Sequence, residues 1–274
     1  MKQLIALLLT PVLGHAGVVY DMAVRPLDQS NIAGQAPDSP AAGAVVTRYF
    51  VDGGQVRVGG PDAKTFYVFK DRTMEVIDNP ARAVHVLKHA TLGQVAAHYT
   101  DSVKQLENAA ATAPSDTRAQ AEQKAADMKA ASDRLLQRVA RDYRVTVRFE
   151  SVDGHACRIW EEREQEAKRM ELCVAPLAAV PGGAEILSGM KTLSQFRQGA
   201  DFAFGVEFGL SEWWADFATL GGVPLLVREY RYDSVVSEVM LTGMRQSALS
   251  ASLFAAPDGY TVQDGPDYAM WYVR

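Results

Sequence analysis

The sequence predicts an α+β protein built on a large, mostly antiparallel sheet that helical regions interrupt. Three observations support this prediction. Short runs alternate between apolar and polar residues, Asp-Gly and Gly-Gly turns separate several of them, and longer stretches repeat apolar residues every three or four positions. Counting the alternating runs gives about 11 or 12 strands.

The clearest turn lies at Asp52-Gly53-Gly54. Asp-Gly supplies the positive φ that a tight hairpin needs, so the runs on either side of this turn should pair. A second pair should meet near Asp233. The strands predicted outside the cysteine region are 17–27, 44–51, 55–60, 64–70, 73–78, 82–89, 223–232, 234–246 and 267–274.

Residues 143–150 alternate cleanly, which is typical of a strand that buries one face. The apolar side is expected to face the core and the polar side to face water. The predicted core side consists of Val145, Val147 and Phe149. The predicted solvent side consists of Arg144, Thr146, Arg148 and Glu150.

The chain has two cysteines, Cys157 and Cys173. They fall in two alternating runs that a polar bend near Gln165 separates, so a hairpin would place them about opposite each other. In an exported protein an even pair favours a disulfide, which is our prediction. A free or metal-binding pair is the alternative.

Helical periodicity appears over residues 92–110 and again, after Pro114-Ser115-Asp116, as far as about Arg141. The proline is expected to break the helix, with an N-cap and an acidic first turn following it. The pair, at about 92–141, should form an αα-hairpin that covers one sheet face or projects. A third helix is predicted at 185–197 and a short fourth around Trp213 and Trp214.

Residues 1–16 resemble a secretory signal peptide. Lys2 gives a positive start, Leu4 to Leu13 are mainly apolar, and Gly14-His15-Ala16 is a small-x-small end. We expect cleavage after Ala16, a periplasmic location and a mature single domain at 17–274 without a transmembrane segment. No cysteine follows the apolar stretch, so no lipid anchor of the bacterial lipoprotein type is expected. A buried N-terminal helix or strand is the alternative.

The composition excludes some classes of function. The formal net charge is −5, or −6 without Lys2, and no cluster of Lys and Arg suggests a nucleic-acid partner. His85 and His89 lie in a strand-like run without a third metal ligand at motif spacing. No nucleophile elbow, phosphate-binding loop or zinc-protease helix is present, so we predict no enzyme, cofactor or metal. The glutamates at 161, 162, 164 and 166 suggest a solvated edge, with a weak cation site as the alternative.

The order of elements resembles a bacterial envelope family known as domain of unknown function 4412. The resemblance rests on the split helical pair, Gly154-x-x-Cys157, Glu171-Leu-Cys-Val-Ala175, and the segment from Ser250 to Tyr260. More distantly, the plan is similar to lipoprotein-carrier folds of the LolA and LolB type. This resemblance implies a curved antiparallel sheet, an unclosed barrel with helices packed in or over its concave face. It implies no catalytic residue.

Such a sheet must either pack tightly against its helices or enclose something apolar. Our first hypothesis is a periplasmic binder or carrier of an apolar ligand, such as an acyl chain, a lipid or a lipidated peptide. The second is an envelope protein-interaction or sensor module that uses the helical pair. For each candidate residue singly, plain core is the alternative. The candidate cavity residues are Phe66, Val68, Leu187, Met190, Phe196, Trp213, Trp214 and Phe217.

Overall fold

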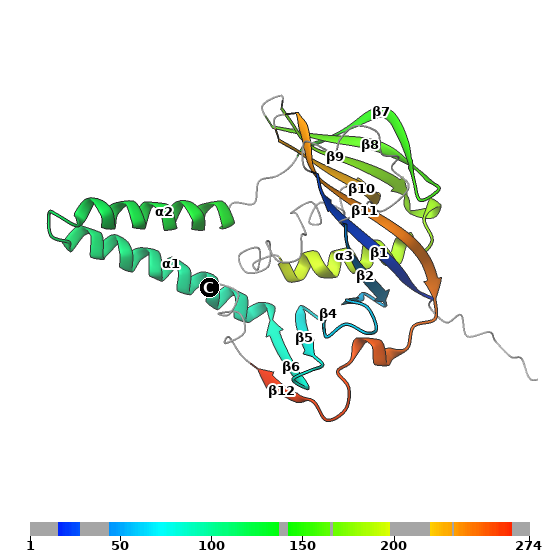
Figure 1. Cartoon of the computed structure of the whole chain (residues 1–274), viewed down its shortest axis with the longest axis horizontal. Coiled ribbons are helices and arrows are strands. Elements are labelled where there is room, and N and C mark those ends of the chain that lie inside the picture. Colours follow the sequence, from blue (N-terminus) through cyan, green and yellow to red (C-terminus); the bar gives the residue numbers. More distant parts are fainter. Residues whose placement is uncertain are drawn as a thin grey trace, which may run out of the picture.

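The described strands of the computed structural model form one sheet of twelve strands, curved and unclosed (Figure 1). The structure describes residues 16–27, 44–136, 142–164, 167–197, 220–231 and 233–264. The strand order is β12-β6-β5-β4-β3-β2-β1-β11-β10-β9-β8-β7. The predicted α+β class with a large, mainly antiparallel sheet is therefore confirmed.

Most strands agree with the predicted runs to within a few residues. Their bounds are β1 Gly17–Pro26, β2 Val45–Asp52, β3 Gln55–Val58, β4 Thr65–Lys70, β5 Thr73–Asp78, β6 Ala83–Lys88, β7 Tyr143–Val152, β8 His155–Glu164, β9 Ala167–Pro176, β10 Gly222–Arg231, β11 Ser234–Ser247 and β12 Thr261–Asp264. The predicted final strand, 267–274, lies outside the described residues.

Strand β12 was not predicted, and it pairs parallel with β6. Every other described strand pair is antiparallel. The hairpins follow from their turn residues. Gly53 and Gly54 have φ of 55° and 80°, and Asp233 also has positive φ, as tight turns between antiparallel strands require.

Three α-helices are present in the described part of the chain: α1 His89–Thr112, α2 Arg118–Leu136 and α3 Gly183–Arg197. Helix α2 begins at Arg118 and has no acidic residue in its first turn, so the predicted acidic start at Asp116 is wrong. The predicted fourth helix lies outside the described residues. None of the described helices is long and apolar enough to cross a membrane.

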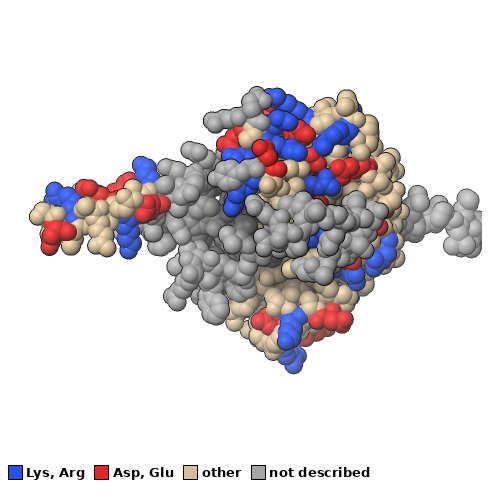
Figure 2. Space-filling model, turned by 45° about the horizontal axis from the view of Figure 1, so that its top comes forward, with Lys and Arg blue, Asp and Glu red and all other residues tan. Residues whose placement is uncertain are grey.

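Helices α1 and α2 form a hairpin that projects away from the sheet (Figure 1). At its tip, the Arg118 guanidinium donates to the Ala113 carbonyl at 3.0 and 3.3 Å. The described side chains buried along the hairpin are mostly small: Val103, Ala110 and Ala125. Lys and Arg are interspersed with Asp and Glu over this tip (Figure 2), so it presents no surface of one charge in that view.

One prediction about β7 is wrong. Val145, Val147 and Phe149 were expected in the core, yet they are 47%, 86% and 67% exposed. The opposite side of β7 is only partly covered: Arg144 and Arg148 are exposed, while Glu150 is half-buried and binds Arg228 of β10. The β7–β8 register shifts between Val145 and Phe149, which bends this edge strand.

Two separate apolar clusters pack against the sheet. The larger cluster includes residues of α3 and of the strands beneath it. The smaller cluster lies on the other side of β1 to β6 and is closed by Phe254 of a short 3-10 turn, Ala251–Phe254. Arg57 is buried beside it, 3.8 Å from the centre of the Phe66 ring, and donates to the carbonyls of Leu253 and Gly60. Burial lowers the pKa of Arg57.

Candidate functional site

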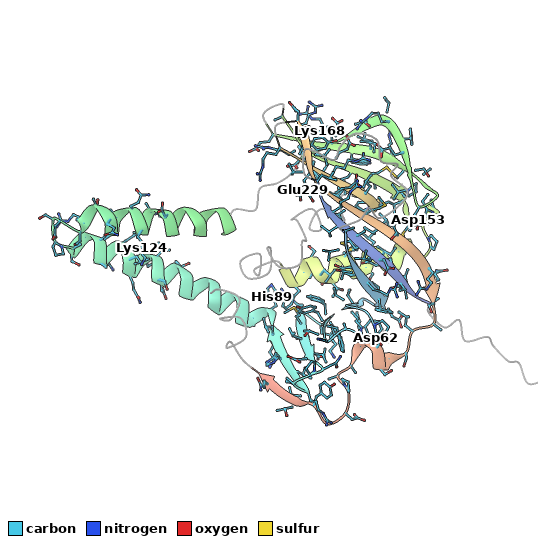
Figure 3. All side chains as sticks on the ribbon, in the orientation of Figure 1. Asp62, His89, Lys124, Asp153, Lys168 and Glu229 are labelled. Atoms are coloured by element: carbon cyan, nitrogen blue, oxygen red, sulfur yellow. A yellow bond between two sulfur atoms is a disulfide. The ribbon has the colours of Figure 1, made fainter. Side chains whose placement is uncertain are left out.

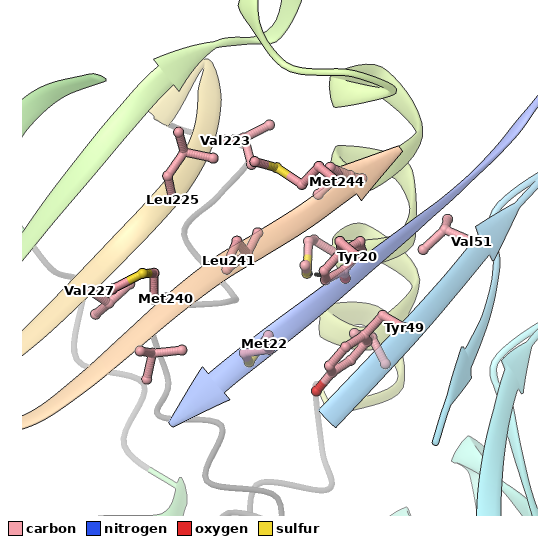
Figure 4. Packing of buried hydrophobic residues seen from close by; sticks show 14 of the residues in the cluster. Tyr20, Met22, Tyr49, Val51, Val223, Leu225, Val227, Met240, Leu241 and Met244 are labelled. Atoms are coloured by element: carbon pink, nitrogen blue, oxygen red, sulfur yellow. Dashed lines mark hydrogen bonds between the residues drawn. The ribbon is translucent and has the colours of Figure 1, made fainter. Parts of the chain in front are cut away.

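Helix α3 lies against one side of the sheet and contacts β1, β2, β3, β4 and β10. We call the apolar surface of the sheet beneath this helix the α3 face. The helix places four side chains there, each no more than 1% exposed: Ile186, Met190, Leu193 and Phe196. Their spacing of three or four residues aligns them on one side of a helix. Figure 4 shows the strand side of this packing around Tyr20, Met22 and Tyr49.

The backbone of α3 approaches the sheet closely at Gly189. A Cβ at that position would lie 2.8 Å from both Cγ atoms of Val51 and 3.1 Å from a Cγ of Val56. Real Cβ atoms essentially never show contacts below 3.0 Å, so only glycine fits without a shift. At the next turn of the helix, the Thr192 hydroxyl donates to the Gly54 carbonyl at 2.6 Å.

Two tyrosines lie on the α3 face with their rings stacked. The ring centroids of Tyr20 and Tyr49 are 5.0 Å apart and nearly parallel, and both side chains are buried. The Tyr20 hydroxyl donates to the Met190 sulfur at 3.8 Å. Burial, with a further contribution from Tyr49, raises the pKa of Tyr20 well above its ordinary value, and burial raises that of Tyr49. Both hydroxyls therefore remain neutral.

The structure brings some of the predicted cavity residues together and separates others. Met190 and Phe196 lie in the larger cluster, and Leu187 packs against it half-buried. Phe66 and Val68 lie in the smaller cluster on the other side of the sheet, so placing them with Met190 was wrong. Alternate residues of a strand face opposite ways, and it is Phe69 that contacts Phe196, with ring centroids 5.5 Å apart. Trp213, Trp214 and Phe217 lie outside the described residues.

A second feature, not predicted from the sequence, is a chain of ion pairs across six consecutive strands of the sheet, from β1 to β7. Arg228 is at its centre, bonding Glu150 at 2.9 and 3.0 Å, Glu171 at 2.9 Å and Glu238 at 3.1 Å. Arg25 extends the chain to β1 by bonding Glu238 at 2.8 Å. Arg148 and Lys168 also bond Glu171, whose side chain is only 3% exposed.

These charges neutralise one another. Burial alone would raise the pKa of Glu171, but hydrogen bonds from Arg148, Arg228 and Lys168 outweigh it and leave the pKa below its ordinary value. Burial likewise opposes the charge of Arg228, but Glu150 and the other carboxylates raise its pKa. An ionised, paired carboxylate has the properties of a structural ion pair rather than of a proton donor.

Further contacts hold β7 and β8 at this end of the sheet. The Gly243 amide of β11 donates to the Asp153 carboxylate at 2.8 Å, which joins the β7–β8 turn to a strand four positions away. Lys168, on the neighbouring strand β9, lies towards one end of this part of the sheet, and Asp153 lies at the other end (Figure 3). Cys157 and Cys173 form the predicted disulfide, with Cα atoms 5.2 Å apart, between β8 and β9.

Within the described residues, no group of three or more His, Cys, Asp or Glu side chains is placed to hold a metal ion. The glutamates that suggested a solvated edge or weak cation site are partly described. Glu161 bonds Arg148 and Arg163, and Glu164 bonds Arg169. Residue 166 lies outside the described residues.

No protein-family model and no curated protein sequence matches this chain. Among solved structures, it is similar to PNGF-II in a C2 and a P21 space group, with TM-scores of 0.36 and 0.34 and 8% identity in each. The similarity covers 93% of this chain and 33% of PNGF-II, so the chain spans about a third of the length of those structures. So slight a similarity supports no inference about activity.

Proposed function

We propose that this chain is a non-catalytic periplasmic binder or carrier of an apolar ligand, such as an acyl chain or a lipidated peptide. We also propose that its fold is LolA-like and that its family is the envelope family known as domain of unknown function 4412. The observation that carries the proposal is the α3 face. One helix covers the apolar side of an unclosed sheet through aliphatic, aromatic and methionine side chains. Methionine adapts well to varied apolar shapes.

The apolar contribution of α3 to this face can be compared with that of an acyl chain. Burial of a large apolar side chain contributes about 1.5–3 kcal/mol, so the four buried side chains of α3 together contribute about 6–12 kcal/mol. A chain of about 16 carbons contributes about 0.8 kcal/mol for each CH₂, or about 12 kcal/mol before the entropic costs of binding. The two apolar contributions are comparable before those entropic costs, and we propose that helix and ligand exchange reversibly on this face.

Two features support the proposed location. The N-terminal segment has the pattern of a signal peptide, and β1 begins at Gly17, so cleavage after Ala16 leaves every described strand whole. The disulfide between Cys157 and Cys173 suits an oxidising compartment such as the periplasm.

A second candidate function is an envelope protein-interaction or sensor module. The observation that favours it is the projecting hairpin of α1 and α2, which continues directly from β6 (Figure 1). Its charged side chains are well exposed, with Asp101 and Lys104 at 67% and 66%. A partner would bind this hairpin without contacting the α3 face.

A reversible lock on α3 tests the carrier proposal. A Cβ on Gly54 would lie 3.6 Å from the Ser188 hydroxyl, so Gly54→Cys with Ser188→Cys places two thiols close enough to join α3 to the β2–β3 turn. The positive φ of Gly54 strains this variant by about 1–2 kcal/mol.

The oxidised variant should not bind a fluorescent acyl ester, and mild reduction should restore binding. Wild type in the same reductant is the control for the native disulfide. A wild-type protein that binds no acyl ester, or a locked variant that binds it normally, would show that the ligand does not replace α3.

A further inference from the structure

Under α3, the Tyr20 hydroxyl is fully buried beside a weak acceptor. Tyr20 is 0% exposed, and among the described residues its hydroxyl donates to the Met190 thioether, 3.8 Å away. A thioether is a weak acceptor, and a buried hydroxyl without a good partner lowers stability. Phenylalanine would fill the same volume without that cost.

The ring that carries this hydroxyl is held firmly. Tyr20 stacks on Tyr49, and the sheet register places these residues directly opposite each other on β1 and β2. The sulfur acceptor, by contrast, belongs to α3. If α3 leaves the face, Met190 leaves with it, while the tyrosine pair stays on the sheet.

We propose that the Tyr20 hydroxyl is the polar recognition group of the ligand site and donates to a carbonyl oxygen of an uncharged acyl ester or amide. This inference rests on the proposed function and names its ligand class. A carbonyl is a better acceptor than the thioether it replaces. An ionised carboxylate is disfavoured, because the described side chains that make up the cluster around Tyr20 are apolar.

Removal of the hydroxyl tests the inference. Displacement of a fluorescent apolar dye would compare methyl dodecanoate with tridecane, a hydrocarbon of similar length. For Tyr20→Phe, the affinity for the ester should fall about threefold to tenfold, the effect of one hydrogen bond, while tridecane binding stays unchanged.

Tyr143→Phe is the matched control, because Tyr143 also donates to a methionine sulfur, that of Met170 at 3.9 Å, but lies on β7. It should change neither affinity. Met190→Leu removes the competing acceptor and should raise the affinity for the ester, by a smaller factor because the thioether is a weak acceptor. In the double variant with Tyr20→Phe, that gain should disappear.

The outcomes separate this inference from the proposed function. If both probes bind and Tyr20→Phe leaves ester binding unchanged, the recognition role is refuted while apolar binding stands. If Tyr20→Phe weakens both probes equally, the hydroxyl matters only for packing. If neither probe binds the wild-type protein, the proposed function and this inference fall together.

Discussion

Gly189→Ala is the most informative change to the packing of α3. The new Cβ would lie 2.8 Å from Val51, and carbon atoms in contact prefer about 3.5–4.0 Å, so α3 must move outward by roughly 1 Å. Overpacking of this kind costs about 1–3 kcal/mol. Alanine is favoured over glycine in a helix by about 1 kcal/mol. The expected net loss of stability is therefore about 0–2 kcal/mol.

Urea unfolding followed by circular dichroism measures this loss. Gln195→Ala, at an exposed position of the same helix, is the control for a substitution to alanine that contacts nothing in the core. Combining Gly189→Ala with Val51→Ala should cost less than the sum of the two single changes, because the smaller side chain makes room for the new methyl group. The same Gly189→Ala change should increase acyl ester affinity, since α3 is held less tightly.

A gain in stability of about 1 kcal/mol for Gly189→Ala, the helix-propensity effect alone, would refute the close packing of α3 on Val51. The close packing would also be refuted if the loss of stability in the double variant equalled the sum of the losses for Gly189→Ala and Val51→Ala.

Three other predictions concern the rest of the molecule. Replacing Cys157 and Cys173 by serine should cost about 3 kcal/mol in urea unfolding, because the bridge closes a loop with a sequence separation of 16; an unchanged midpoint would contradict this. The pKa of Glu171 is lowered on folding, so its ionised form stabilises the fold above about pH 4.3, and this contribution is lost as pH falls through the folded-state pKa. Glu171→Gln should therefore be less stable at neutral pH and flatten the acid limb of the stability curve; a limb as steep as in wild type would count against the ion-pair account. Lys104→Glu with Lys129→Glu should leave the affinity for an acyl ester unchanged. If the hairpin binds an envelope partner, the double variant should pull down less of that partner than wild type does. Equal amounts pulled down by the two proteins would count against a partner on the hairpin.

The sequence predicted the local features well. The hairpin around Gly53 needs only neighbouring residues and a positive φ, and the pairing of Cys157 with Cys173 needs only one bend between two strands. Both are short-range effects. The approximate ends of most strands could therefore be predicted from turn chemistry and alternation alone.

Long-range features could not be predicted in the same way. The alternation of apolar and polar residues along β7 shows that the strand has two different sides, but it does not show which side faces the core. The apolar side is exposed, and on the other side Glu150 bonds Arg228, a residue 78 positions later in the chain. The parallel pairing of β12 with β6 also depends on a distant strand.

The candidate site was predicted in part. Helical spacing placed Met190 and Phe196 on one side of α3, but strand spacing alone gave no way to decide between Phe66 and Phe69. Tyr20 and Tyr49 were missed because each occurs singly in a β-strand, and only the sheet register brings their rings together.

Native mass spectrometry of the mature protein, purified from a bacterial periplasm, tests most directly whether an apolar ligand occupies the α3 face. The account predicts an acyl-containing ligand mass that organic extraction removes and that the locked Gly54→Cys, Ser188→Cys variant fails to regain when it is oxidised. A protein mass without ligand, unaltered by incubation with envelope lipids, would contradict the account and would favour the α1–α2 hairpin as the functional surface.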